Sequence, residues 1–154
     1  MNPTFATPYN LPVTKDHEDR VKLELLRAGV TKYGLFKSES RYLPRVILPN
    51  EHIGGVVYGQ SPVGSVMLVA TDERILYIDR KPLFNVVDEI SYGVVSGCRV
   101  SQQGPFTAVV LHTRIQNFTL KYVNPTCARI FEDYIALRCI DSTFPYKSVY
   151  NNIY

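Results

Sequence analysis

Residue types that could perform catalysis occur in this sequence without the spacing that catalysis requires. The run Gly59-Gln60-Ser61-Pro62-Val63 begins like the G-x-S-x-G turn that exposes a nucleophilic serine, but valine replaces the final glycine. The run would also join two strands, whereas the serine of that motif sits between a strand and a helix. We therefore expect that the protein is not an enzyme, and a small hydrolase is the least favoured function.

Histidine and cysteine residues also lack the spacing of a metal site. The histidines are far apart and form neither an H-x-x-x-H nor an H-E-x-x-H arrangement: His17, His52 and His112. The cysteines are odd in number and contain no CxxC pair: Cys98, Cys127 and Cys139. We expect buried thiols inside a strand and a helix, with no disulfide framework, no metal and no cofactor.

Basic residues form one compact group in the second half of the chain. Arg74, Arg80 and Lys81 border a predicted hairpin, where an anionic partner could dock. Asp72, Glu73 and Asp79 lie beside them in the sequence, so a solvated rim that neutralises itself is the favoured interpretation.

Tyrosines mark the end of the chain. Tyr146, Tyr150 and Tyr154 recur at every fourth position and could align on a helix or anchor an extended arm. Tyrosine is enriched in binding surfaces because it joins a large apolar ring to a polar tip. A tail that packs on its own domain is an equally good interpretation.

Length and charge indicate one globular domain with an appendage. The chain has 154 residues, 45% hydrophobic and 20% charged, with a net charge of +3. Residues 1 to 50 hold eight Lys or Arg against five Asp or Glu, while residues 51 to 154 hold nine of each. This balance disfavours a nucleic-acid partner. The sequence has no apolar run of about 18 residues, as a membrane span requires, and its start lacks the basic and apolar segments of a secretory signal. We therefore expect a cytoplasmic protein.

The N-terminal third is predicted to be an arm followed by helices. The opening segment to Pro12 has no periodicity and reads as an extended arm. Thr14 can cap a helix from about Lys15 to Ala28, with Val21, Leu25 and Leu26 on its apolar side and Gly29 as its stop. Ser38 is a possible N-cap for a second short helix toward Ile47, which Pro44 would bend or limit to a turn.

From Glu51 onward the pattern becomes extended. Two apolar runs, residues 65–71 and 74–79, are joined by Asp72-Glu73 and predict a β-hairpin. With a first strand at residues 53–58 and further segments at 84–92, 94–102, 105–113 and 115–123, the sequence predicts seven strands. In the last one, Phe118, Leu120 and Tyr122 alternate with polar residues and are predicted to face the core.

A helix is predicted to close the β-structure. Asn124-Pro125 supplies an N-cap and a first-turn proline. The apolar stripe that follows consists of Cys127, Ile130, Phe131, Tyr134, Ile135 and Leu137, with Arg129, Glu132 and Asp133 expected to face water. Burial of this stripe requires the sheet or barrel mouth.

This order of elements, and the wording of the hairpin, resembles bacterial pleckstrin-homology-like (PH-like) domains. Gly64 to Asp79 looks like the family's "apolar strand, then T-D-x-R, then apolar strand" hairpin, and Asp88 to Gly97 is similar to its next strand and turn. The resemblance spans about residues 51–139. It implies a mainly β (α+β) fold: a seven-stranded antiparallel β-sandwich or barrel capped by a C-terminal helix. We divide the chain into an arm and helical extension (1–50), a PH-like domain (51–140) and a Tyr-rich tail (141–154).

The resemblance implies a scaffold that binds lipid head groups, peptides or proteins, or assembles with copies of itself. Relatives that bind phosphoinositides keep basic residues in the loop between the first two strands, and Gly59 to Gly64 has none. The leading hypothesis is therefore a non-catalytic interaction or assembly module that binds a protein partner or itself. The alternative is a peripheral binder of anionic membrane lipid through Arg74, Arg80 and Lys81.

Overall fold

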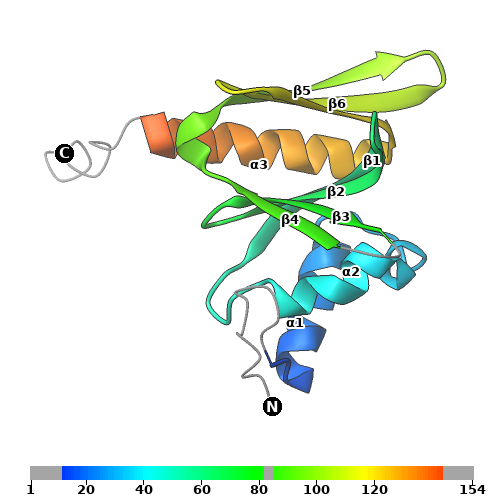
Figure 1. The fold of residues 1–154 in the computed structure, drawn as a ribbon, viewed down its shortest axis with the longest axis vertical. Helices are drawn as coiled ribbons and strands as arrows, with labels where there is room; N and C mark the ends of the chain where they lie inside the picture. Colours follow the sequence, from blue (N-terminus) through cyan, green and yellow to red (C-terminus); the bar gives the residue numbers. More distant parts are fainter. Residues whose placement is uncertain (1–11, 82–84, 144–154) are drawn as a thin grey trace, which may run out of the picture.

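The computed structural model describes residues 12–81 and 85–143 and shows a seven-stranded antiparallel sheet with helices on both of its faces (Figure 1). The strands are β1 (Ile53–Ser61), β2 (Gly64–Thr71), β3 (Ile75–Arg80), β4 (Asn85–Ile90), β5 (Val95–Gln103), β6 (Phe106–Thr113) and β7 (Asn117–Val123). Their order in the sheet is β4-β3-β2-β1-β7-β6-β5, and the two halves join where β1 meets β7 at Gln60 and Lys121. The predicted mainly β fold and its seven strands are confirmed.

The long helix α3 (Pro125–Thr143) lies between the β5–β6 layer and the β1–β4 layer (Figure 1). Asn124 caps it, since Asn124 Oδ1 accepts hydrogen bonds from the backbone N–H groups of Thr126 and Cys127 at 2.9 and 3.2 Å. Phe131 and Ile135 are fully buried, together with the inward residues of β1, β2, β3, β6 and β7. Leu137 is 64% exposed, so the predicted stripe was one residue too wide.

Close approach of α3 to the sheet depends on two glycines of β1. A Cβ atom at Gly54 would lie 2.0 Å from Tyr134 Cε2, and one at Gly55 would lie 2.9 Å from the Phe131 Cα atom. Any larger residue would therefore push α3 away from β1. The register of β1 against β2 also shifts between Ile53 and Gly55, which marks a bulge at this contact.

The N-terminal helices cover the opposite face of β1, β2 and β3. Helix α1 (Lys15–Arg27), a 3₁₀ turn η1 (Gly34–Phe36), helix α2 (Ser38–Tyr42) and a second turn η2 (Leu43–Arg45) lie below the sheet in Figure 1. Val21, Leu25 and Leu43 pack with Met67 and Leu76 in a second core cluster. Strands β2 and β3 are thus buried on both faces, which explains their nearly continuous apolar sequence.

The helix ends follow the sequence with small differences. Thr14 Oγ1 accepts the His17 N–H at 3.2 Å, and Gly29, with φ of +96°, follows the last turn of α1 as predicted. Leu26 was assigned to the apolar side but is 44% exposed. The residue that precedes α2 is Lys37, so Ser38 lies inside that helix rather than capping it.

Tyr122 departs from the predicted alternation of β7. Its φ is +60°, and the β6–β7 register shifts between Thr107 and Val109, so one extra residue is accommodated on β7. The bulge turns Tyr122 outward, where it is 63% exposed and lies 4.6 Å, centroid to centroid, from the Phe106 ring. The prediction that Tyr122 faces the core was therefore wrong.

Candidate functional site

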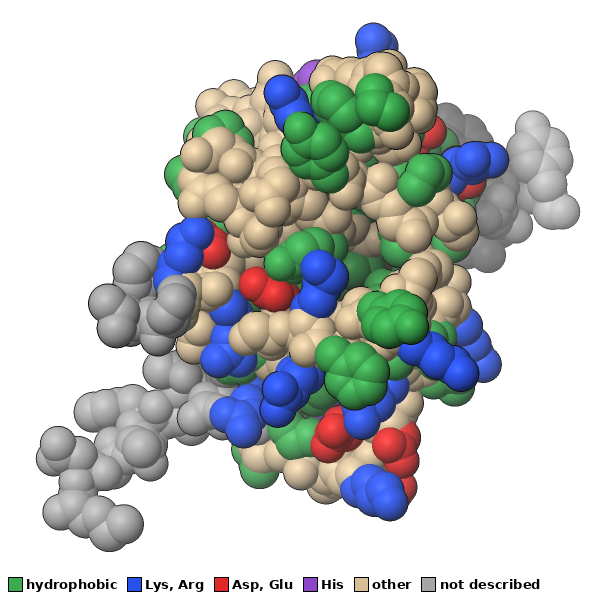
Figure 2. Space-filling view, turned by 90° about the vertical axis from the view of Figure 1, so that its right-hand side faces the viewer, with side chains coloured by type: hydrophobic (Ala, Val, Ile, Leu, Met, Phe, Trp, Pro, Cys, Tyr) green, Lys and Arg blue, Asp and Glu red, His purple; other side chains and the backbone are tan. Residues whose placement is uncertain are grey.

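A groove of about 550 Å³ runs between α1 and the segment formed by η1, α2 and η2. We call it the helical groove. Its apolar side chains are Val13, Leu25, Leu35, Phe36 and Pro44, and its basic ones are Lys22, Lys32, Arg41 and Arg45. Figure 2 shows Lys and Arg side chains gathered over the lower part of the molecule, with apolar side chains among them. The surface combines apolar contact area with positive charge.

The helical groove contains one carboxylate in its described lining. Glu18 Oε1 lies 3.1 Å from Lys22 Nζ, four residues later on the same exposed face of α1. The other three cations have no carboxylate within 4 Å among the described residues. The groove therefore carries an excess of positive charge that its own walls do not neutralise.

Arg20 fixes α1 to the loop that leads into β1. Its Nη1 donates to Glu24 Oε2 at 2.7 Å and to the Glu51 carbonyl at 2.8 Å, and its Nη2 donates to the carbonyls of Leu48 and Pro49 at 3.2 Å. On the other wall, Ser40 Oγ donates to the Gly34 carbonyl at 2.7 Å and ties α2 to η1. These bonds hold both walls of the helical groove in place.

A second pocket, of about 290 Å³, lies between α2, η2 and the end of β3. We call it the arginine pocket, since Arg41, Arg45 and Arg80 line it together with Ser38 and Tyr42. The guanidinium carbon of Arg80 lies 4.5 Å from the centroid of the Tyr42 ring. None of the three arginines has a carboxylate within 4 Å in the described part of the chain.

The carboxylate next to Arg80 in the sequence, that of Asp79, belongs to the other face of the sheet. Side chains alternate along β3, so Ile78 and Arg80 face the N-terminal helices and Asp79 faces the interior of the β-structure. Asp79 is 8% exposed at its side chain, and its Oδ1 lies 3.3 Å from Lys81 Nζ. Asp79 therefore does not neutralise the arginine pocket.

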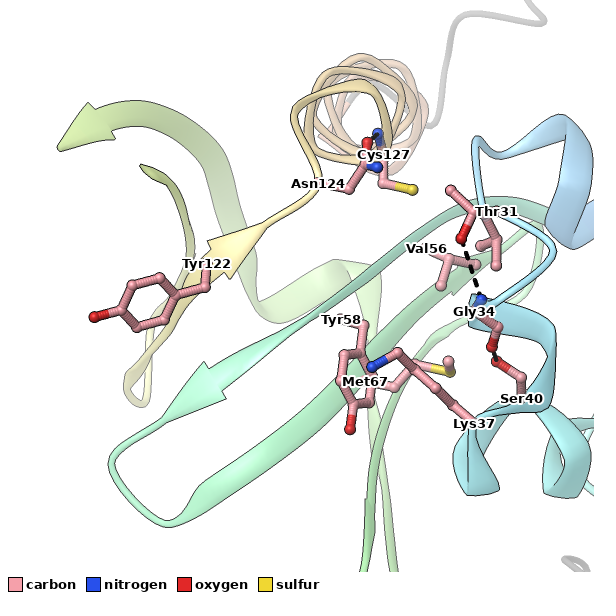
Figure 3. Close-up of a pocket in the computed structure, with 11 residues that line it drawn as sticks. Thr31, Gly34, Lys37, Ser40, Val56, Tyr58, Met67, Tyr122, Asn124 and Cys127 are labelled. Atoms are coloured by element: carbon pink, nitrogen blue, oxygen red, sulfur yellow. Dashed lines mark hydrogen bonds between the residues drawn. The ribbon is translucent and has the colours of Figure 1, made fainter. Parts of the chain in front are cut away.

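A third, smaller pocket of about 180 Å³ lies where the N-terminal segment meets β1, β2 and the start of α3 (Figure 3). Lys37 Nζ lies 3.7 Å from the centroid of the Tyr58 ring, and Thr31 Oγ1 accepts the Gly34 N–H at 3.2 Å. Burial raises the pKa of the Tyr58 hydroxyl and of the Cys127 thiol, so both stay protonated at neutral pH. These contacts are those of a packing junction.

The predicted basic group is divided by the length of β3. Arg74 precedes the strand and Arg80 ends it, about 20 Å away at roughly 3.3 Å per residue. Lys81 stays at the Arg80 end, where its Nζ donates to the Val63 carbonyl at 2.8 Å. The structure therefore brings Arg80 and Lys81 to the same end of the strand and Arg74 to the other.

Arg74 is enclosed by its own partners. Its Nε and Nη2 donate to the two oxygens of Glu51 at 2.9 and 3.0 Å, its Nη2 also donates to the Val46 carbonyl at 3.0 Å, and its Nη1 pairs with Glu89. The side chain of Arg74 is 13% exposed and that of Glu51 is fully buried. Arg74 therefore belongs to the folded framework, and its charge is already paired with Glu51 and Glu89.

The other residues considered from the sequence are engaged in structure. Ser61 Oγ donates to the Gly64 carbonyl at 2.9 Å inside the β1–β2 turn. Cys127 is buried as expected, while Cys98 and Cys139 are half-buried. Burial raises the pKa of the Cys98 thiol to about 12, with further contributions from Glu132 and Cys139. The three tyrosines of the tail, Tyr146, Tyr150 and Tyr154, lie outside the described residues.

The described residues contain neither a cluster of metal ligands nor a membrane-spanning helix. No group of three or more His, Cys, Asp or Glu side chains there could hold a metal ion. Within the same ranges, no helix is long and apolar enough to cross a membrane.

The sequence signal for the helical groove and the arginine pocket was present but weak. Arg41 and Arg45 are four residues apart in a short helical segment, and Arg80 follows 35 residues later. Nothing in the linear sequence shows that Arg80 meets the other two. Only the packing of α2 on β3 brings the three together.

Comparison with known proteins places this fold among PH domains. A family model described as "Bacterial PH domain" matches residues 47–136, which is more than half of the chain. A crystal structure of a DUF1696 family protein with a pleckstrin-homology domain from Shewanella loihica matches with a TM-score of 0.35 and 17% identity, covering 68% of this chain and 91% of that one. The comparison with curated proteins gave no match.

Proposed function

The chain belongs to the bacterial PH domain family, and from that premise we propose that it is a non-catalytic interaction module that binds a protein segment in the helical groove. PH-like domains commonly mediate interactions and are generally non-catalytic. The observation that carries the proposal is the combination of an apolar floor with four cations, of which only Lys22 has a carboxylate partner among the described residues.

Charge complementarity indicates the nature of the bound segment. Its carboxylates would meet Lys32, Arg41 and Arg45, and its apolar side chains would cover Leu35 and Phe36. Phe36 is 76% exposed, and a large exposed aromatic side chain beside a groove is typical of residues that dominate binding energy. The proposed partner is therefore an acidic protein segment with apolar anchor residues.

Fluorescence anisotropy tests this proposal. The probe is a pool of labelled peptides that mix Asp, Glu, Leu and Phe, compared with a pool in which Lys replaces the acidic residues. We expect saturable binding of the acidic pool alone, weakened about tenfold by Phe36→Ala, a loss of about 1.4 kcal/mol. Ile115→Ala is the matched control because Ile115 is 81% exposed and lies between β6 and β7. Equal binding of both pools, or no binding, would contradict the proposal.

A second copy of the chain is a separate outcome of this test. Static light scattering on the purified protein should show a monomer at micromolar concentrations. A dimer that dissociates in Phe36→Ala would mean that the helical groove binds another copy. Deletion of residues 141–154 tests whether the tyrosine tail contributes to such contacts, as the sequence suggested.

An anionic membrane is the second candidate, favoured by one observation. Tyr33 and Phe36 are 87% and 76% exposed and lie near Lys32 and Lys37 in the chain, an arrangement that suits an interface with anionic lipid. Arg74, Arg80 and Lys81 support this candidate less, since Arg74 is enclosed by Glu51 and Glu89. Liposome co-sedimentation with anionic lipid at low and physiological salt tests it, and absence of pelleted protein in both conditions rejects it. The leading proposal keeps the cytoplasmic location expected from the sequence, which imaging of a fluorescent fusion checks.

A further inference from the structure

The arginine pocket gathers three cations from two separate parts of the chain. Arg41 and Arg45 come from α2 and η2, before the residues matched by the family model, and Arg80 comes from β3 within them. Both Arg41 and Arg45 also line the helical groove, so the two cavities adjoin each other. Arg80 lines only the arginine pocket, and Lys32 lines only the helical groove.

We propose that the arginine pocket binds the phosphoryl group of a phosphoserine on the protein segment that occupies the helical groove. The inference rests on the proposed function and names a modification of the partner that the pocket would recognise.

The chemistry of the pocket fits a dianion better than a carboxylate. A phosphoserine carries a charge of about −1.5 to −2 near neutral pH and offers three strong acceptor oxygens. Each guanidinium can present two parallel N–H groups to such oxygens. The charge of a single carboxylate would neutralise only one of the three arginines, whereas a phosphoryl group neutralises most of the local excess. Ser38, whose hydroxyl can donate a further hydrogen bond, lies on the same wall.

Holding the three arginines together without a carboxylate partner among the described residues costs stability in the free protein. Like charges at neighbouring helical positions such as Arg41 and Arg45 destabilise by about 0.2 to 0.5 kcal/mol. Stacking of Arg80 on the Tyr42 ring keeps its guanidinium in place despite this repulsion. The pocket is therefore arranged for an anion before the anion arrives, and binding relieves the repulsion.

The geometry favours a protein-borne phosphate over a lipid head group. The arginine pocket shares Arg41 and Arg45 with the helical groove, where Leu35 and Phe36 can contact the chain on either side of a modified serine. A lipid head group needs no such groove. Phosphopeptides and phosphoinositide vesicles, used as separate probes, distinguish the two sources.

Peptide pools with and without phosphate test the inference on the full chain. The acidic pool described above is prepared with a fixed central serine, either free or phosphorylated, and its affinity is measured for wild type, Arg80→Gln, Lys32→Gln and the exposed control Arg99→Gln. We expect phosphorylation to tighten binding to wild type about tenfold. Arg80→Gln should abolish this gain and leave the affinity for the free-serine pool unchanged, whereas Lys32→Gln should weaken both pools equally.

Each failure has its own signature. Equal affinity for the two pools, or a phosphate gain that survives in Arg80→Gln, overturns the inference while the proposed function stands. Binding of neither pool overturns both proposals. Vesicles that contain phosphatidylinositol phosphate and bind only when Arg80 is present, together with no phosphate gain for the peptides, would assign the pocket to a lipid head group and overturn the inference.

Inorganic phosphate tests the pocket without any peptide. Titration at about pH 8, where most of the inorganic phosphate is the dianion, is followed through the Nε–H NMR signals of the arginines, with sodium chloride at equal ionic strength as the control. Saturable shifts of wild-type signals that disappear in Arg80→Gln support the site. Shifts that grow linearly and match those in chloride would overturn it.

Discussion

Strand β3 has an arginine at each end, and the two ends differ in what surrounds the charge. Arg74 is paired with Glu51 and Glu89 and is 13% exposed. Arg80 shares a pocket with Arg41 and Arg45, and none of the three has a carboxylate partner among the described residues. A basic residue near a hairpin can thus serve either the fold or the surface, and only its partners tell which.

The largest effect is expected at the Arg74 end. Arg74→Met keeps an extended apolar side chain but leaves the fully buried carboxylate of Glu51 without its cation. We expect a loss of about 3 to 5 kcal/mol in the free energy of unfolding, measured by urea denaturation. A loss below about 1 kcal/mol would show that the Arg74 end is no more structural than the Arg80 end.

Glu51, the partner of Arg74, should make the free energy of unfolding depend on pH in the acid range. Burial alone would raise the pKa of Glu51, but the hydrogen bonds from Arg74, Leu48 N–H and Thr71 outweigh it, so the pKa lies below its ordinary value of 4.5. A lowered pKa means that ionised Glu51 stabilises the fold fully above the ordinary value. That contribution is lost as the pH falls through the lower pKa of the folded state.

Replacement of Glu51 isolates this dependence. In Glu51→Gln the amide oxygen can still accept from Arg74 Nε and Thr71 Oγ1, but the amide NH2 group then faces the N–H donors of Arg74 Nη2 and Leu48. We therefore expect a loss of about 1 to 3 kcal/mol in the free energy of unfolding at neutral pH. Below the ordinary carboxyl pKa, the difference between Glu51→Gln and wild type should shrink. A difference that stays constant across the acid range would show that Glu51 is not the titrating group.

At the Arg80 end, substitution should cost little. Arg80→Gln loses the stacking on Tyr42, which is worth about 0.5 to 1 kcal/mol, and breaks no ion pair with a described residue. Thermal and urea unfolding should therefore place this variant within about 1 kcal/mol of wild type. A larger loss would move Arg80 into the same structural class as Arg74.

The smallest effect should have the opposite sign. Arg45→Gln removes one of three neighbouring like charges and should stabilise the free protein by about 0.2 to 0.5 kcal/mol at low ionic strength. The gain should disappear near 1 M salt, where the screening length is about 3 Å. A destabilised variant at low salt would indicate that Arg45 has a structural partner.

The fold could be predicted from local signals that each act over a few residues. The hairpin could be predicted because Thr71 closes its turn locally. Thr71 Oγ1 accepts hydrogen bonds from the N–H groups of Glu73 and Arg74 at 3.1 and 3.0 Å. The start of α3 was equally local, because Asn124 alone satisfies two free N–H groups. Tyr122 was misassigned because a bulge, which breaks the two-residue period, leaves no mark in the sequence.

The candidate site could be predicted only in part. Arg80 was identified from its neighbour Lys81, but Arg41 and Arg45 were missed because their meeting with Arg80 depends on tertiary packing. Met67 and Val69 carried an unused clue. Both alternate with core residues in β2 and are fully buried. The continuous apolar sequence of β2 therefore indicated that other parts of the protein pack on both faces of the sheet.

The N-terminal helices that cover the outer face of β1, β2 and β3 determine which side chains a partner can contact. The N-terminal helices of the chain already cover this surface of the sheet. A binding partner on this side therefore contacts side chains of α1, α2 and η2 instead of the strands. We expect that an exchange of the exposed residues Lys32, Phe36, Arg41 and Arg45 would redirect recognition. Buried residues of the same segment, such as Leu43, would keep the helices packed on the sheet, so selectivity and folding are carried by different faces of one short segment.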